Sequence, residues 1–237
     1  MEIQPQRREG ALWLRNDMGR VKYSDEERNQ IMMKFLTCAR EMIDTEGMES
    51  VSIRKVSQRA GFNSATLYLY FKDVDELITL ASMGYLESYC RDLGQDMALM
   101  QTPRDVYFHT WKIFCRHAFQ RPKVFYHLFF HPHAFSMDNE VNRYYEIYPD
   151  VLGDFDGVLR EMLQQGKLSD RNMKALVPVA AEYGLTEQQV TLVNDLTVCY
   201  FKKLLEETKR PNGDCDVEPL VQKMLQAIEF LFLTGKR

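Results

Sequence analysis

Apolar residues recur at helical spacing near the N-terminal end of the chain. Ile31 and Phe35 fall on one face of a helix, and Ser24 lies three residues before Glu27, in the pattern of a capping box. Gly47 follows this segment and can take the left-handed backbone conformation that ends a helix. We therefore predict a first helix between Ser24 and Gly47.

The next segment predicts two shorter helices joined by a tight turn. Ser52 is placed to cap the second helix, and Gly61 is placed to end it with a positive φ angle. After a turn of about three residues, Asn63 or Ser64 caps a third helix. We expect this third helix to run through Phe71.

The rest of the chain keeps the 3.6-residue periodicity and has no strict alternation of apolar and polar residues, so we predict an all-α fold. Asp73 caps a long fourth helix, and Pro178 is expected to break or kink a later one. Two helices are expected to begin at Pro103 and Pro122, and others to span residues 144–165, 170–182, 186–209 and 216–233.

We divide the chain into an N-terminal tail at residues 1–23, a three-helix head at 24–72 and a helical body at 73–237. Residues 1–72 carry 12 Lys and Arg against 10 Asp and Glu, whereas the body carries 18 against 24. The head is therefore slightly positive and the body negative, which weakly favours a polyanionic partner for the head.

Residues 51–73, VSIRKVSQRAGFNSATLYLYFKD, contain the parts of a helix-turn-helix. Gly61 lets the chain reverse, and Ala60 lets two helices approach closely. The alternative is that the tyrosines of this segment only pack within a three-helix bundle. We expect the exposed face of the third helix to bind phosphates or base edges of double-stranded DNA through Asn63, Ser64, Thr66, Tyr68 and Tyr70.

This segment resembles the signature of the TetR family of transcription regulators. Tyr68, Phe71, Lys72 and Leu77 match the family pattern, and the resemblance covers roughly residues 28–78. It implies an N-terminal three-helix helix-turn-helix DNA-binding domain, followed by a helical domain for effector binding and dimerisation.

The resemblance also assigns roles to single residues. It implies that Arg54, at the start of the second helix, contacts a backbone phosphate while Ser52 caps that helix. The family often has a Lys where this chain has Val74, and we expect Lys72 to make that phosphate contact instead.

The function implied is that of a ligand-responsive regulator in the cytoplasm, commonly a repressor, which binds a quasi-palindromic operator as a homodimer. The alternatives are a TetR-like protein that acts through a protein partner without binding DNA, and a helical enzyme. The chain has no GxSxG, Walker, GxGxxG or HExxH motif, so we predict no enzyme, no catalytic residue and no cofactor.

Aromatic residues are dense between positions 106 and 155. The resemblance implies that this region holds an effector pocket whose occupation moves the fourth helix, and an apolar or aromatic ligand would suit it. Core packing is the alternative for any single residue. The residues predicted to line the pocket are Tyr107, Trp111, Phe114, Phe129 and Tyr145.

The last two predicted helices each carry an apolar stripe. In the family, the corresponding helices of two subunits form a four-helix bundle, and burial within one chain is the alternative. The predicted dimer-interface residues are Val193, Leu196, Tyr200, Met224, Ile228 and Leu231.

A metal site is the weaker interpretation of the histidines near position 130. His127 and His131 lie four residues apart, with His133 and Asp138 nearby, but Pro132 ends the helix that would present them. We therefore predict no metal.

Composition excludes several other classes. The 5 cysteines are scattered without CxxC spacing, which argues against a disulfide framework and favours a reducing compartment. No apolar run approaches the roughly 20 residues that span a bilayer. The basic residues between Arg7 and Lys22 could form an arm in the minor groove, but Glu2, Glu9 and Asp17 dilute their charge, so we favour a simple tail.

Overall fold

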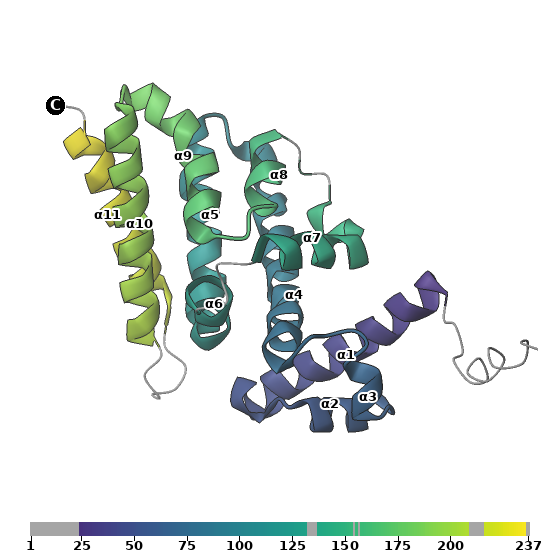
Figure 1. Ribbon diagram of the computed structural model, residues 1–237. Coiled ribbons are helices and arrows are strands. Elements are labelled where there is room, and N and C mark those ends of the chain that lie inside the picture. The colour runs from purple at the N-terminus through teal and green to yellow at the C-terminus, as the bar shows by residue number, and fades with distance from the viewer. Residues whose placement is uncertain (1–23, 132–136, 154, 156, 209–215, 236–237) are drawn as a thin grey trace, which may run out of the picture.

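The computed structural model describes residues 24–131, 137–153, 155, 157–208 and 216–235. Every regular element within these ranges is a helix, which confirms the all-α prediction. Figure 1 shows a small group of helices at one end, a long helix that leads away from it, and a larger helical body. The predicted N-terminal tail lies outside the described residues.

The head contains α1 (Asp25–Glu46), α2 (Ile53–Ala60) and α3 (Ser64–Leu67), with a 3₁₀ turn η1 (Met48–Ser50) between the first two. The connecting helix α4 (Val74–Gln95) follows directly. It packs against α1 of the head and against α5, α6 and α7 of the body. A displacement of α4 in the body would therefore reach the head.

The helix ends of the head form as the sequence predicts. The Ser24 backbone N–H donates to the Glu27 carboxylate at 2.7 Å, and the Ser24 hydroxyl accepts from the Glu27 backbone N–H at 3.2 Å, which completes the capping box. Gly47 and Gly61 follow α1 and α2 with φ angles of 87° and 79°. Asp73 caps α4 by accepting from the Glu76 backbone N–H.

Two helices of the body begin at the predicted prolines, α5 (Pro103–Gln120) and α6 (Pro122–Phe130). Its later helices pack as a group in which α9 contacts α8 and α10, and α11 contacts α5 and α10. None of the described helices is both long and apolar enough to cross a membrane. The remaining elements are η2 (Met97–Leu99), α7 (Met137–Ile147), η4 (Pro149–Leu152), α8 (Gly157–Leu163), α9 (Leu168–Tyr183), α10 (Glu187–Thr208) and α11 (Glu218–Gly235).

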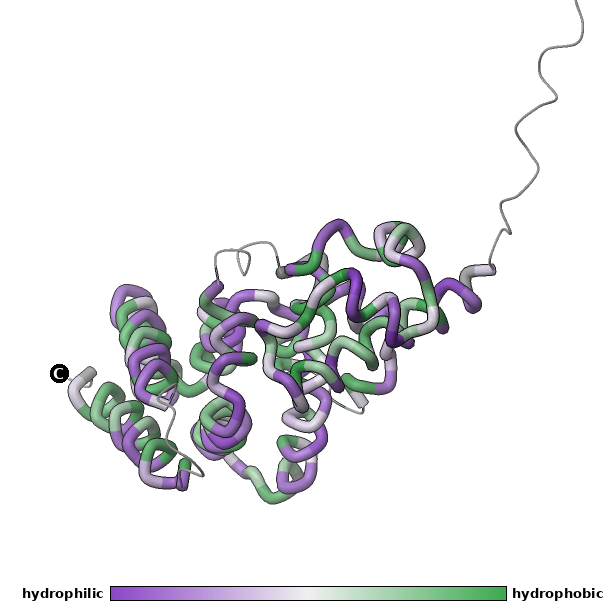
Figure 2. Tube along the Cα trace, turned by 90° about the horizontal axis from the view of Figure 1, so that it is seen from below, coloured by the Kyte–Doolittle hydropathy of each residue, from purple (hydrophilic) through white to green (hydrophobic). Residues whose placement is uncertain are grey.

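The helices α10 and α11 stand side by side at the edge of the body opposite α7 (Figure 1), and they remain neighbours in the second view (Figure 2). Apolar and polar residues alternate along both of them in Figure 2, as expected for helices with one face turned inward.

The single helix predicted over residues 144–165 is wrong. The chain instead forms α7, η4 and α8 there. Proline disfavours the helical conformation of the residue that precedes it. Tyr148, which precedes Pro149, accordingly has φ −126° and ψ 68°. Gly153 and Gly157 then adopt positive φ angles, so the chain turns between η4 and α8.

A smaller prediction also fails. The third helix ends at Leu67, and a turn follows it, so it does not reach Phe71 as a helix. Of the break or kink predicted at Pro178, the break does not occur, since α9 continues through Pro178 to Tyr183. The loss of one backbone hydrogen bond is tolerated there.

Candidate functional site

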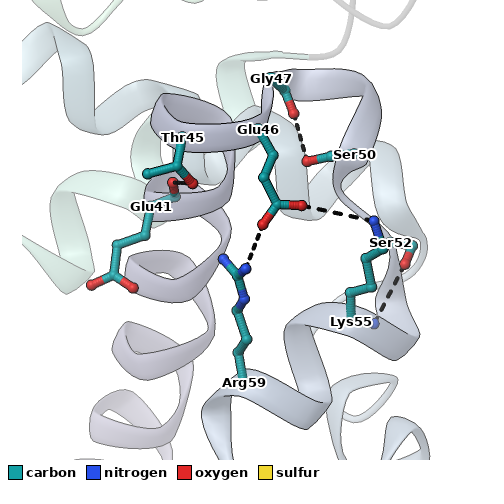
Figure 3. A network of polar contacts seen from close by, with 8 residues as sticks. All are labelled: Glu41, Thr45, Glu46, Gly47, Ser50, Ser52, Lys55 and Arg59. Carbon is teal, nitrogen blue, oxygen red and sulfur yellow. Dashed lines mark hydrogen bonds and ion pairs between the residues drawn. The ribbon is translucent and has the colours of Figure 1, made fainter.

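One carboxylate ties the end of α1 to α2 (Figure 3). Glu46 forms an ion pair with Arg59 and lies 3.8 Å from Nζ of Lys55. The Ser52 hydroxyl caps α2 by accepting from the Lys55 backbone N–H at 3.4 Å. Exposed ion pairs add little stability, but together these contacts set the orientation of α2 on α1.

The turn between α2 and α3 is fixed by local contacts. The ring of Phe62, just after Gly61, packs 5.2 Å from the ring of Phe35 in α1. The Asn63 side-chain oxygen then caps α3 by accepting from the Thr66 backbone N–H at 2.8 Å and from the Thr66 hydroxyl at 3.1 Å. The start of α3 is thereby held in one orientation, which a helix that reads DNA requires.

Most of the residues predicted to contact DNA lie on the surface of this unit. Tyr68 is 58% exposed, and Arg54 and Lys72 form no ion pair with any residue that the structure describes. Their charges are therefore available to a polyanion. Asn63 is exposed as well, while Ser52, Ser64 and Thr66 are partly buried and take part in caps or in the first turn of α3.

Tyr70 does not lie on this surface, contrary to the prediction. It is 9% exposed, and its ring centroid is 5.9 Å from that of Phe35. The physical reason is that α3 ends at Leu67, so the turn after it rotates Tyr70 toward α1, whereas Leu69 is exposed. Tyr70 therefore belongs to the core of the head.

Sequence reasoning missed Arg143, which joins the body to the head. It lies on α7, and its guanidinium donates hydrogen bonds to the Glu76 carboxylate, to the Tyr70 backbone carbonyl and to Sδ of Met32 at 3.3 Å. The same group lies 5.7 Å from the ring centroid of Phe71. A lone arginine on an amphipathic helix gave no sign of this role, since its partners lie more than sixty positions earlier in the chain.

A second contact between head and body depends on a glycine. Arg40 of α1 lies over Gly84 of α4, and its Nε donates to the Ala81 carbonyl at 3.4 Å. A Cβ atom at position 84 would lie 1.9 Å from Cζ of Arg40. Close by, the Tyr85 hydroxyl donates to the Asp44 carboxylate at 2.8 Å. Side chains of α1 therefore form hydrogen bonds directly with α4.

The residues predicted to line an effector pocket lie together in the body, but they are packed as a core. All five are buried, and their rings contact one another or neighbouring rings; Trp111 and Phe114, for example, lie 5.8 Å apart between centroids. The cavity beside these two residues has a volume of only about 20 Å³. In the described residues these side chains therefore form a packed core, and their role in an effector pocket stays a prediction.

A polar network crosses this aromatic core. The Asn172 side-chain oxygen accepts from the Tyr107 hydroxyl at 2.8 Å and from Trp111 Nε1 at 2.9 Å. The Asn172 amide nitrogen donates to the Asn194 side-chain oxygen at 2.8 Å. Burial raises the pKa of Tyr107, so its hydroxyl stays protonated and acts as the donor. The network joins α5, α9 and α10.

A larger cleft lies where α1, α4, α7 and η4 meet. Its volume is about 860 Å³, within the range of small-molecule sites. Its walls mix apolar and charged groups, including Met33, Glu87, Arg91, Tyr148 and Phe155. No residue of this cleft was predicted, because it is built from the segment that we had taken for one straight helix.

The predicted dimer-interface residues divide into two sets. Val193, Met224 and Ile228 are buried within the single chain, so they cannot form a surface that a second subunit contacts. Leu196 is 44% exposed, and Tyr200 and Leu231 are partly buried. Val193, Met224 and Ile228 face inward because the neighbouring α9, α5 and α6 cover that side of α10 and α11.

The exposed apolar residues of α10 and α11 lie at matching ends of the two helices. Leu192 and Leu196 stand near the start of α10, and Phe230, which is 65% exposed, stands near the end of α11 with Leu233. The two helices run antiparallel (Figure 1), so these side chains occupy one end of the pair. We name Leu192, Leu196, Phe230 and Leu233 the apolar edge.

The histidines considered as metal ligands have another partner. Nε2 of His127 lies 3.0 Å from the Thr79 hydroxyl, and its ring lies 4.9 Å from that of His131. No group of three His, Cys, Asp or Glu side chains in the described ranges is placed to hold a metal ion. His133 lies outside those ranges, as does the side chain of Asp138.

Comparisons with known proteins agree with this architecture. Residues 35–80 match the family model of bacterial regulatory proteins of the tetR family. No curated protein sequence matches the chain. Among solved structures, FadR of Thermus thermophilus, a TetR-family transcriptional repressor in complex with lauroyl-CoA, is similar with a TM-score of 0.53 and 13% identity, over 87% of this chain and 95% of FadR.

RolR in complex with resorcinol is similar to the same degree, with a TM-score of 0.53 and 17% identity over 90% of this chain and 97% of RolR. The structure of RolR without ligand also gives 0.53, at 16% identity. At these identities the likeness concerns the fold, which extends over nearly the whole chain.

A helix-turn-helix head, carried on a long connecting helix that enters a helical body, is the architecture that these structures share with the chain. The match over residues 35–80, from within α1 to within α4, shows a DNA-binding segment similar to that of TetR-family regulators.

Proposed function

We propose that this protein is a ligand-responsive repressor that acts in the cytoplasm, binding a quasi-palindromic operator as a homodimer. The observation that carries the proposal is the head itself. Its exposed face presents Tyr68 with two cations, Arg54 and Lys72, that no described carboxylate neutralises.

In this proposal the start of α3 enters the major groove. Asn63, Ser64, Thr66 and Tyr68 approach base edges or phosphates, while Arg54 and Lys72 contact the backbone. The capping bonds of Asn63 occupy its oxygen, so its amide nitrogen is the group left for DNA. Tyr70 takes no part, because it is buried.

The dimer is proposed to form through the apolar edge of α10 and α11. Large apolar side chains exposed together on neighbouring helices favour burial against a second surface. A two-fold dimer places the same face of both subunits together, and it would supply the two heads that a palindromic site requires.

The effector is proposed to act by moving α4 or α7, because these two helices of the body contact the head. A ligand shifts such an equilibrium only as far as it prefers one state over the other. The small molecules bound to FadR and RolR support a ligand-binding body here, and the same body is the most aromatic part of this chain.

The test is fluorescence anisotropy of the purified protein with tiled duplexes from the DNA that flanks its coding region, repeated over a salt series. We expect one tile to bind well above the rest, with an affinity that falls as salt rises. Arg54→Gln should weaken this binding and reduce the salt dependence by about one counterion.

Lys174→Gln is the matched control, since it removes the same charge from α9, where Lys174 pairs with Glu161 on the surface of the body. Equal affinity for every tile, or equal losses in the two variants, would count against a specific operator contact by the head.

A further inference from the structure

A buried cation stands in the aromatic core of the body. Arg171 of α9 is 4% exposed, and its guanidinium donates to the backbone carbonyls of Gln165 at 2.6 Å and of Leu163 at 3.0 Å. It also lies 5.3 Å from the ring centroid of Phe129. Among the described residues, no carboxylate forms an ion pair with it.

The two carbonyls orient this group but leave its charge in place. A carbonyl oxygen satisfies an N–H donor, whereas only an anion cancels a full positive charge in an apolar interior. Charged side chains are rarely buried without such a partner. Burial of this unpaired charge therefore destabilises the folded body, and an anion bound next to Arg171 would reduce that free-energy cost.

The surroundings of Arg171 suit such an anion. The guanidinium lines the cavity of about 20 Å³ together with Thr110, whose side chain is 6% exposed and whose hydroxyl has no hydrogen-bond partner. The other walls are mainly apolar and aromatic, and include Tyr89, Trp111 and Phe114. One cation and one free hydroxyl therefore face the same small space inside an aromatic shell.

We propose that the effector is a small organic acid whose carboxylate pairs with Arg171 and accepts a hydrogen bond from Thr110, while its apolar part packs among Trp111, Phe114 and Phe129. A guanidinium and a hydroxyl are the donors that a carboxylate needs. This inference rests on the proposed function, because it names the ligand class of the same effector-responsive body.

The cavity has room for about one water molecule, so the ligand must displace part of its wall. The wall includes Met162 of α8, a flexible side chain on a helix of seven residues that packs chiefly against α9. The Arg171 bonds to Leu163 and Gln165 hold the end of α8 in place. A carboxylate that competes for Arg171 would therefore release α8 and open the cavity.

The hydrogen bond between Arg171 and the Leu163 carbonyl also connects the cavity to the head. The Leu163 carbonyl accepts from Arg171 and also from the Tyr145 hydroxyl at 3.2 Å, and burial raises the Tyr145 pKa to about 12, so this hydroxyl remains a donor. Tyr145 lies on α7, two residues after Arg143, which holds the Tyr70 carbonyl. Movement of Leu163 would thus reach the DNA-binding head through one helix.

The first experiment measures binding of benzoate and phenylacetate by calorimetry, with benzamide and phenylacetamide as neutral isosteres and sodium chloride at equal ionic strength. We expect the carboxylates to bind and the amides and chloride not to. Arg171→Gln should weaken carboxylate binding about tenfold to a hundredfold, and Thr110→Val about threefold to tenfold.

Arg116→Gln is the control, since Arg116 forms an exposed pair with Glu218 on another face of α5. Thr110→Val keeps the test informative if Arg171→Gln fails to fold. Absence of binding by either carboxylate, binding of amides as strong as acids, or full affinity in both site variants would overturn the proposal.

The second experiment adds the carboxylate to the protein bound to its operator. At matched occupancy by benzoate, set by titration, Tyr145→Phe should release the operator less than the wild type does, because the link from Leu163 to α7 is cut. If Tyr145→Phe releases DNA like the wild type, the route through α7 is wrong. Operator binding without ligand is measured in the same series, so a failure of this inference is separable from a failure of the proposed function.

Discussion

The guanidinium of Arg143, on α7 of the body, donates a hydrogen bond to the backbone carbonyl of Tyr70, in the turn after α3. The same side chain pairs with Glu76 at the start of α4. One residue of the body therefore fixes both the end of the recognition segment and the beginning of the connecting helix. The proposed effector would therefore act on the head through α7, along with α4.

Arg143→Met should weaken operator binding by about threefold to thirtyfold, which is the range for a residue that couples two parts of a protein. The substitution keeps an unbranched apolar stem but removes the guanidinium and with it the bonds to Tyr70 and Glu76. Anisotropy with the operator measures the loss, and thermal denaturation checks the fold. Unchanged affinity in a folded variant would show that the head holds its orientation without α7.

Tyr68 and Tyr70 should respond in opposite ways to substitution by Ala. Tyr68→Ala is expected to weaken operator binding with little change in stability, because this side chain is largely exposed. Tyr70→Ala is expected to lower the free energy of unfolding by about 2–4 kcal/mol, since it leaves a cavity beside Phe35. Calorimetry and anisotropy on both variants test the pair. Equal stability of the two variants would contradict the burial of Tyr70.

The helices of the head could be predicted from local signals, because single residues determine where each of these helices begins and ends. Ser24, Gly47, Ser52, Gly61 and Asp73 act through their own backbone or through bonds to residues three positions away, which a sequence displays directly. The cap of α3 by Asn63 was predictable for the same reason.

The parts that could not be predicted depend on contacts between distant segments. Tyr70 turns inward because α3 stops after one turn, and Arg143 and Arg171 owe their roles to partners that only folding brings near. The side of α10 that faces outward could not be predicted for the same reason. Periodicity locates the apolar face of a helix but does not show which neighbouring helix covers it.

Gly84→Ala should have an effect that depends on Arg40. In the wild type the new Cβ forces the Arg40 guanidinium away from α4, which offsets the gain in helix stability that Ala brings. In an Arg40→Ala background that clash is absent, so the same change should stabilise the protein by about 0.5–1 kcal/mol. Thermal or denaturant unfolding of the four proteins of this cycle measures the coupling. Additive effects would mean that Arg40 does not rest on Gly84 in solution.

The cysteines should differ sharply in their reaction with a thiol reagent. Cys199 is exposed on α10, whereas Cys115 and Cys90 are buried, and burial raises the Cys90 pKa to about 12. Because the thiolate is the reactive form, Cys199 should react fast in a folded monomer such as Leu196→Arg is designed to give, more slowly in the proposed dimer that covers this face of α10, and the two buried thiols only after unfolding. All measurements use a protein that also carries Cys215→Ser, because Cys215 lies outside the described residues and its own labelling would complicate the result. Rapid labelling of Cys90, identified by peptide mass, would contradict this packing of α4.

Leu196→Arg should convert the proposed dimer to monomers or aggregates, because it places a charge in the apolar edge where a second subunit would bury it. Phe230→Asp on α11 should act in the same way, since its side chain lies at the same end of the helix pair. Val177→Arg on α9 is the control, as this residue is also exposed and apolar but lies outside the apolar edge. Sedimentation of the three variants at matched concentrations decides the matter. A stable dimer in both edge variants would move the interface to another face, whereas dissociation by Val177→Arg alone would place it on α9.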